Sequence, residues 1–267
     1  MGGTGGVLTA DQVRNLSREL MEAEKSKRPV DQITSRFEGI TVADAYRIQM
    51  ATIGTKVAEG HKIIGKKIGL TSKAMQDLLG VAEPDYGHLL DDMLVHEGEA
   101  VDCASLCQPK AEGEVAFVLK KDLEGPGLTV VDVLRATEGV MAAIEIVDSR
   151  VRDWKIKIQD TVADNASSAM FVLGSRLVNP CDIDLRLVGM VLEKNGQVLS
   201  TAAGAAVLGH PAVAVAWLAN KLSEYGLGLS AGEVVLSGAF TAAPPVAAGD
   251  VFRVTFDRLG SVGCRFA

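Results

Sequence analysis

The sequence predicts a mixed α/β (α+β) protein in which a β-rich body follows a helical segment. Helical periodicity dominates residues 9–60, whereas short runs rich in Val, Ile and Phe recur from residue 61 onward. The 267 residues, 48% of them hydrophobic, are enough to bury a full core in one large domain. We therefore expect a flexible N-terminus over residues 1–8, a helical segment over 9–60 and a main domain over 61–267.

Helix signals occur in both parts of the chain. The stretches predicted to be helical are 9–27, 41–60, 129–140 and 211–226. Thr9, followed three residues later by Gln12, matches a capping box at the first helix start. In the last stretch, Pro211 suits the first helical turn and Gly226 suits the stop.

Strand signals fill most of the main domain. The predicted strands are 62–70, 114–121, 142–148, 169–175, 187–194, 233–238, 250–256 and 261–266. Asn195-Gly196 lies between two strand-like runs and predicts a hairpin turn. The helices interspersed among these strands indicate one mixed α/β domain.

Charge and composition exclude several classes of function. The 34 acids outnumber the 27 bases, and no basic run could follow a phosphate backbone, so we expect no nucleic acid partner. The longest apolar windows are interrupted before the ~20 residues that a membrane span needs. The N-terminus lacks a basic head and an apolar run, which predicts a cytoplasmic protein. Four scattered cysteines match neither a zinc cage nor a disulfide framework.

Two acids occur together at the start of a predicted apolar strand. Residues i and i+2 of a strand point the same way, so Glu112 and Glu114 would stand side by side, opposite the face of Val115 and Phe117. A third acid, Glu145, lies in the apolar run 142–147, where an ionised carboxylate is costly to bury without a partner.

Three converging carboxylates offer hard oxygen ligands suited to Mg²⁺ or Mn²⁺. A cation would relieve the repulsion between Glu112 and Glu114. The alternative is that these two acids lie on a solvated strand face while Glu145 pairs with Arg150 or Arg152.

A pair of lysines lies in another apolar strand. Lys66 and Lys67 point to opposite faces of this strand, so one ammonium is expected to point inward. A buried lysine near a metal site can transfer protons. Each lysine could instead extend its ammonium to the surface.

Several long blocks resemble the 2-hydroxypentadienoate hydratase (2-keto-4-pentenoate hydratase) and 4-oxalocrotonate decarboxylase family of the fumarylacetoacetate hydrolase superfamily. These blocks are GKKIGLTSKAMQDLLGVAEPDYGHL, QPKAEGEVAFVLKKDLEGPG, EIVDSRVRDWKIKIQDTVADNAS, EKNGQVLSTAAGAAVLGHP and LGSVGCRF. The resemblance runs from about Thr9 to the C-terminus. It implies a fumarylacetoacetate hydrolase-like catalytic domain over 61–267.

The resemblance also implies roles for individual residues. Its metal-binding acids fall on Glu112, Glu114 and Glu145, and its proton-transfer residues fall on Lys67 and Asp85. The substrate-binding positions implied are Asn165, Ser167 and Thr241. Alternatively, Asp85 caps a turn, Asn165 and Ser167 satisfy loop backbone, and Thr241 ends a strand.

The expected function is that of a lyase of the meta-cleavage breakdown of aromatic compounds. A hydratase would add water to 2-hydroxypenta-2,4-dienoate, or a substituted homologue, to give 4-hydroxy-2-oxopentanoate with Mg²⁺ or Mn²⁺ as cofactor. The alternatives are a 4-oxalocrotonate (2-oxohex-3-enedioate) decarboxylase and a catalytically silent partner subunit. The resemblance further implies a homo-oligomer, and a complex with the partner hydratase or decarboxylase of the pathway.

Overall fold

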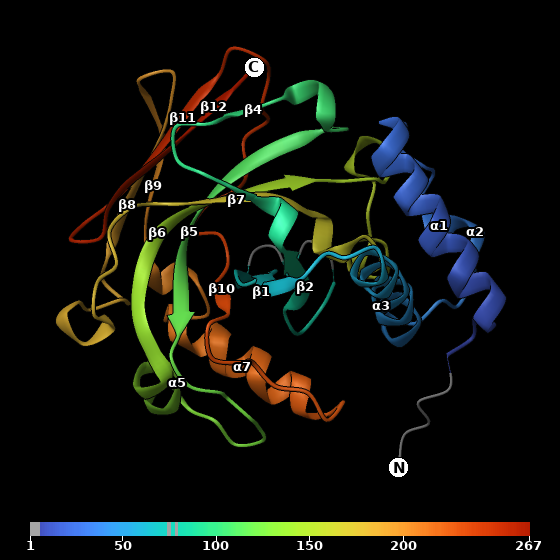
Figure 1. Ribbon diagram of the computed structural model, residues 1–267, viewed down its shortest axis with the longest axis horizontal. Coiled ribbons are helices and arrows are strands. Elements are labelled where there is room, and N and C mark those ends of the chain that lie inside the picture. The colour runs from blue at the N-terminus through green and yellow to red at the C-terminus, as the bar shows by residue number, and fades with distance from the viewer. Residues whose placement is uncertain (1–5, 74–75, 78–79) are drawn as a thin grey trace.

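The computed structural model describes residues 6–73, 76–77 and 80–267, which form helices packed around two β-sheets (Figure 1). The helices are α1 (Ala10–Ser26), α2 (Ile33–Arg36), α3 (Val42–Ala58), α5 (Val130–Ala136), α6 (Ile158–Ala163) and α7 (Pro211–Ser223). The strands are β1 (Ile63–Gly69), β2 (Asp85–Leu90), β3 (Leu94–Val95), β4 (Ala100–Val101), β5 (Pro109–Leu119), β6 (Thr137–Asp148), β7 (Ser168–Leu173), β8 (Gly189–Lys194), β9 (Gln197–Ala203), β10 (Val234–Leu236), β11 (Val251–Phe256) and β12 (Gly260–Phe266). The mixed α/β fold class predicted from the sequence is confirmed.

Local signals place several elements correctly. Thr9 and Gln12 form the predicted capping box of α1, each side chain bonding the other residue's backbone N–H. Pro211 opens α7, and the His210 imidazole caps it by accepting a hydrogen bond from the Ala212 N–H. Asn195 and Gly196 both have positive φ, as a tight hairpin between β8 and β9 requires.

Several predicted boundaries are wrong, two of them on the strands that carry the acids. The helix expected over 129–140 ends at Ala136, and residues 137–140 already belong to β6. Thr137 is β-branched, and the next residues join a long ladder with β5, so cross-strand pairing overrides the helical spacing. The acid-bearing strand begins at Pro109, so Glu112 and Glu114 lie inside β5.

The larger sheet has the strand order β2-β1-β10-β5-β6-β7-β3, and the smaller has the order β4-β12-β11-β8-β9. The two sheets pack through the β5 face that carries Gly113, which lies against Met190 of β8 and Val254 of β11. The opposite β5 face carries Glu112 and Glu114, because side chains alternate along a strand. The strands of the larger sheet therefore present the acids away from the smaller sheet.

The N-terminal helices lie beside the larger sheet, on the right in Figure 1. Buried side chains of α1 and α3, such as Leu16 and Ile48, belong to the same hydrophobic core as Phe117 of β5. In the segment expected to be flexible, the Val7 and Leu8 N–H groups donate to the Asp44 carboxylate, whereas residues 1–5 lie outside the described part of the chain. The division into segments 9–60 and 61–267 stays a prediction.

Candidate metal and proton-transfer site

Two strands bring three carboxylates together. Glu112 of β5 lies directly opposite Glu145 of β6 in the antiparallel ladder, and Glu114 is opposite Ala143. Alternation along each strand places all three acids on one face of the sheet. One carboxylate oxygen from each acid lies within 4.8 Å of the others. Folding thus assembles the trio that the sequence predicted as metal ligands.

The acids are buried with few hydrogen bonds to satisfy them. Glu114 and Glu145 are 0% exposed, and Glu112 is half-buried. Glu114 Oε2 accepts a hydrogen bond of 2.7 Å from the Gly238 N–H. Glu114 Oε1 and both Glu145 oxygens have no hydrogen-bond partner among the described residues. Glu145 Oε1 does form an ion pair with Lys67, with a distance of 3.4 Å to its Nζ.

Burial and the repulsion of neighbouring charges raise the pKa of Glu112 and of Glu114. Burial, followed by the Glu145 charge, raises the pKa of Glu112 to about 7. Burial and the charges of Glu145 and Glu112 raise the pKa of Glu114 well above its ordinary value. Without a cation, Glu112 and Glu114 therefore resist carrying two full negative charges at neutral pH.

Lys67 and Asp85 stand beside this trio. Lys67 of β1 pairs with Leu236 of β10, which pairs with Ala116 of β5, so Lys67 shares the face of the acids. A Cβ added at Gly69 would lie 2.2 Å from Asp85 Oδ1 and 3.6 Å from Lys67 Nζ, so the two groups approach each other there.

The charges in this group oppose each other. Burial lowers the pKa of Lys67, but the neighbouring acids, Glu145 first among them, outweigh it and leave this pKa above its ordinary value. Burial raises the pKa of Asp85 to about 6, although the Lys67 charge opposes that rise. Asp85 Oδ1 is buried and has no hydrogen-bond partner in the described part of the chain.

The sequence-based alternatives for these charges are wrong. Arg150 pairs with Asp164 and Arg152 with Asp31, so neither arginine neutralises Glu145. Neither lysine reaches the surface, because Lys66 and Lys67 are only 6% and 4% exposed. Lys66 points to the other face, where it forms an ion pair with Glu233 at 2.8 Å.

The three predicted substrate-binding residues lie in two loops. Asn165 and Ser167 belong to the turn η4 (Asn165–Ser167), and both are buried. The Asn165 amide is bonded to the backbone of His88, and the Ser167 hydroxyl lies 3.4 Å from Asp164 Oδ2. Thr241 is half-buried, and its hydroxyl accepts a hydrogen bond from Ser200. Contact of these residues with a substrate stays a prediction.

Sequence reasoning named Thr241 in the loop after β10 but missed Ser237 and Gly238 at the start of that loop. Besides the Gly238 N–H that binds Glu114, this loop buries Ser237, whose hydroxyl has no partner among the described side chains and backbone groups. Gly238 has φ +112°, and an added Cβ would lie 2.3 Å from Thr71 Oγ1. The Ser237-Gly238 pair directly after an apolar strand was the available signal, because glycine permits a close backbone approach.

The donor set fits a hard divalent cation. Three carboxylates, two of which have buried oxygens without a hydrogen-bond partner among the described residues, supply hard oxygen donors, and Mg²⁺ and Mn²⁺ are bound by such ligands. The orphaned oxygens are the observation behind this fit, since a buried carboxylate needs a counter-charge or hydrogen bonds. Glu112, Glu114 and Glu145 are the residues that could hold the ion.

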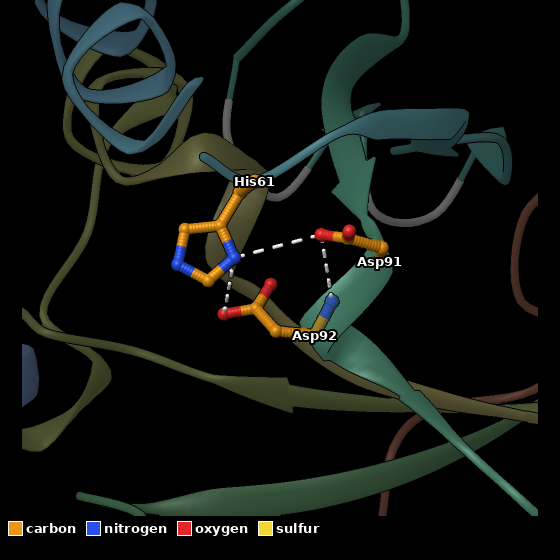
Figure 2. Close-up of side chains that lie close together, drawn as sticks. All are labelled: His61, Asp91 and Asp92. Carbon is orange, nitrogen blue, oxygen red and sulfur yellow. Dashed lines mark hydrogen bonds and ion pairs between the residues drawn. The ribbon is translucent and has the colours of Figure 1, made fainter. Parts of the chain in front are cut away.

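A second group of potential ligands lies at the surface, where His61, from the segment between α3 and β1, lies close to Asp91 and Asp92, which precede β3 in the chain (Figure 2). His61 Nδ1 is 3.5 Å from Asp91 Oδ1 and 3.6 Å from Asp92 Oδ2. Asp91 Oδ1 already accepts hydrogen bonds from the N–H groups of Lys62 and Asp92. Since all three side chains are at least one-third exposed, solvent and backbone satisfy this group without a metal.

Comparison with known proteins places the chain in a family. The fumarylacetoacetate (FAA) hydrolase C-terminal family matches residues 68–267, so the chain belongs to it. Over 256 residues the chain is 49% identical to a 2-hydroxyhexa-2,4-dienoate hydratase of Comamonas testosteroni, covering 95% of this chain and 97% of that protein. Over 216 residues it is 54% identical to a 2-hydroxypent-2,4-dienoate hydratase of Pseudomonas putida, covering 80% and 97%.

The fold also matches a solved structure. The chain superimposes on 4-oxalocrotonate decarboxylase from Pseudomonas putida G7, complexed with magnesium and adipate, with a TM-score of 0.96. The two are 43% identical, and the match covers 98% of this chain and 100% of the decarboxylase. Among the described helices of our chain, none has the length and apolar character to cross a membrane.

Proposed function

We propose that this protein is a divalent-metal-dependent hydro-lyase that hydrates 2-hydroxypenta-2,4-dienoate, or a substituted homologue, in the meta-cleavage degradation of aromatic compounds. The observation that carries the proposal is the trio Glu112, Glu114 and Glu145 beside the buried Lys67 and Asp85. The 49% and 54% identities to dienoate hydratases support this reaction.

A bound Mg²⁺ or Mn²⁺ would supply Lewis-acid polarisation of the substrate's carboxylate and C2 oxygen. Glu112, Glu114 and Glu145 would hold the ion. The Lys67 ammonium and the bound ion together would offset the charge of these acids and attract an acidic substrate to a protein of net charge −7.

The chain's own residues then have protons to transfer in two successive steps. In the first step, C5 of the dienol gains a proton and the C2 hydroxyl loses one, which gives a conjugated ketone. In the second step, water adds its oxygen to C4 and a proton to C3, which gives the 4-hydroxy-2-oxo acid. Lys67 offers N–H donors and Asp85 an acceptor oxygen, Oδ1, that lacks a partner among the described residues. These two groups therefore provide an acid and a base, and either can serve in either step.

The decarboxylase is the second candidate, favoured by the TM-score of 0.96 to 4-oxalocrotonate decarboxylase. The experiment that tests both functions uses purified protein with Mg²⁺ and either 2-hydroxypenta-2,4-dienoate or 2-oxohex-3-enedioate. We expect loss of the dienoate absorbance with the first compound. Release of CO₂ from the second compound without hydration of the first would replace the hydratase by the decarboxylase.

No turnover of either compound would favour a silent partner subunit, although the complete set of acids and Lys67 argues against this. Homo-oligomer formation, association with a pathway partner and a cytoplasmic location stay predictions. Sedimentation at micromolar concentration tests the first, and a stable monomer would contradict it.

A further inference from the structure

β2 is an edge strand whose outer side is nevertheless buried. It pairs with β1 on one side and ends the strand order of the larger sheet on the other. All six of its residues, Asp85 to Leu90, are buried. Backbone N–H and C=O groups on a buried edge need partners, because leaving them unpaired costs about as much as a lost hydrogen bond.

Two side-chain amides supply those partners. Asn165 Oδ1 accepts a hydrogen bond of 2.8 Å from the His88 N–H, and Asn165 Nδ2 donates one of 2.9 Å to the His88 carbonyl. Gln49 Nε2 donates to the Tyr86 carbonyl at 3.0 Å and to the Val162 carbonyl at 2.9 Å. The Asn165 amide thus bonds both polar groups of one residue, as an antiparallel strand would.

The Gln49 amide also contacts the His88 imidazole ring, so that the two side chains form one hydrogen-bond network. Gln49 is 0% exposed, and its Oε1 lies 3.1 Å from His88 Nδ1. Through these contacts Gln49 joins α3, β2 and the carbonyl of Val162 near the end of α6. Fully satisfied buried networks of this kind hold elements in one arrangement.

The Asn165 side of the network holds a strained turn. Asn165, Ala166 and Ser167 have φ values of +53°, +50° and +55°, which is the left-handed region for three successive non-glycine residues. Such strain persists only when the surroundings hold it in place. β2 approaches this turn so closely that a Cβ added at Gly87 would lie 2.4 Å from the Asn165 carbonyl oxygen.

We propose that Gln49 and Asn165 are positioning residues, which stand in for a missing strand along the outer edge of β2 and thereby fix Asp85 beside Lys67. Asp85 is the first residue of β2, and Gln49 bonds the carbonyl of the next residue, Tyr86. The N-terminal helix α3 thereby sets the geometry of a proton-transfer group. This inference rests on the proposed function for the role of Asp85, but the bracing of β2 can be measured independently.

The test compares two variants, each of which removes a buried or half-buried side-chain amide that bonds backbone groups. Gln49→Met keeps the length of the side chain and removes both N–H donors. Asn220→Met is the control, because the Asn220 amide bonds both the N–H and the carbonyl of Leu128, each at 2.9 Å, in the same manner as Asn165 bonds His88. Leu128 lies in the loop before α5, so the control removes an equivalent clamp outside the site.

The first measurement is amide hydrogen exchange of the β2 peptide by mass spectrometry. Gln49→Met should speed exchange in β2 by about tenfold or more, whereas Asn220→Met should leave it unchanged. Mn²⁺ affinity, measured by calorimetry, should stay within about threefold of the parent in both variants, because the acids lie on β5 and β6. Unchanged β2 exchange in Gln49→Met would overturn the bracing.

The second measurement is a double-mutant cycle on turnover. Gln49→Met should lower kcat by about 10²-fold with little change in KM, since a misplacement of about 1 Å can cost that much. In an Asp85→Asn background the same substitution should lower kcat by less than about threefold. Equal losses in both backgrounds would show that Gln49 does not act through Asp85, and would overturn the positioning role.

The bracing of β2 remains testable if Gln49→Met fails to fold or if the parent protein fails to hydrate the dienoate. If Gln49→Met does not fold, Asn165→Asp replaces it, because the carboxylate keeps the acceptor for the His88 N–H and loses the donor to the His88 carbonyl. Faster β2 exchange in this variant supports the bracing, and unchanged exchange overturns it. If the parent fails to hydrate the dienoate, the proposed function fails, and the exchange rates alone decide whether β2 is braced.

Discussion

Glu112 and Glu145 face each other directly across the β5–β6 ladder, although both side chains are acids. Like charges opposite one another destabilise a sheet, and burial increases the penalty. The sheet keeps this pair, with Glu114 alongside, at a cost in stability that a bound cation would offset.

Metal removal should abolish activity and lower stability. Exhaustive chelation is expected to stop turnover, and Mg²⁺ or Mn²⁺ should restore it. Because the ion binds the folded carboxylates, a concentration of 100 times its Kd should stabilise the protein by about 2.7 kcal/mol. Parallel activity assays and thermal melts check this. Full turnover by the metal-free protein would contradict the metal site.

The metal-free protein should become less stable as the pH rises from about 4.5 to about 7. The folded-state pKa of Glu112 is raised from 4.5 to about 7, so over this range the folded state binds more protons than the unfolded state. Stability from this group is therefore complete below about pH 4.5 and is lost as the pH rises through about 7. Urea unfolding at several pH values, with and without Mn²⁺, measures the effect.

Glu112→Gln serves as the test variant for this pH dependence. It should flatten the stability profile in the metal-free protein and weaken Mn²⁺ binding, because it removes one charge from the trio. Glu138→Gln is the control, since Glu138 is an exposed acid on the same strand as Glu145. A Glu112→Gln profile as steep as that of the parent would refute the assignment.

The variants Glu145→Gln and Lys67→Ala should distinguish the effect of losing a metal ligand from the effect of losing a proton-transfer residue. Glu145→Gln keeps the side-chain shape and removes a charge, so metal affinity should fall and excess Mn²⁺ should recover part of the activity. Lys67→Ala leaves the three acids intact, so metal binding should persist while turnover drops by about 10²- to 10⁴-fold. Calorimetry and turnover assays on both variants give the contrast. Normal turnover in Lys67→Ala, or parental metal affinity in Glu145→Gln, would remove the corresponding role.

Gly238→Ala should damage both the fold and the metal site. The backbone at Gly238 has φ +112°, and the new Cβ would lie 2.3 Å from Thr71 Oγ1. Relief of this contact requires the loop to move, which breaks the hydrogen bond from the Gly238 N–H to Glu114. We expect a loss of about 1–3 kcal/mol in unfolding free energy and weaker Mn²⁺ binding. Gly189→Ala is the control, since an added Cβ there meets nothing within 4 Å.

The sequence by itself determined the features that depend on neighbouring residues. The capping box of Thr9 and Gln12, the Asn195-Gly196 hairpin and the shared face of Glu112 and Glu114 all follow from spacing within a few positions. Such local signals are read correctly because helix and strand periodicity repeats over short distances. The same reasoning failed at Thr137, where the helical spacing of the sequence continues but the chain enters the long strand β6.

Only the tertiary structure decided which groups meet. The register that sets Glu145 against Glu112, and the strand order that brings Lys67 rather than Lys66 to the acids, depend on pairing between distant segments. A shift of one residue in either ladder would turn these side chains to the other face. The contact of Gln49 with β2 likewise arises from packing of α3, because spacing within a sequence does not specify which backbone groups a buried amide will find.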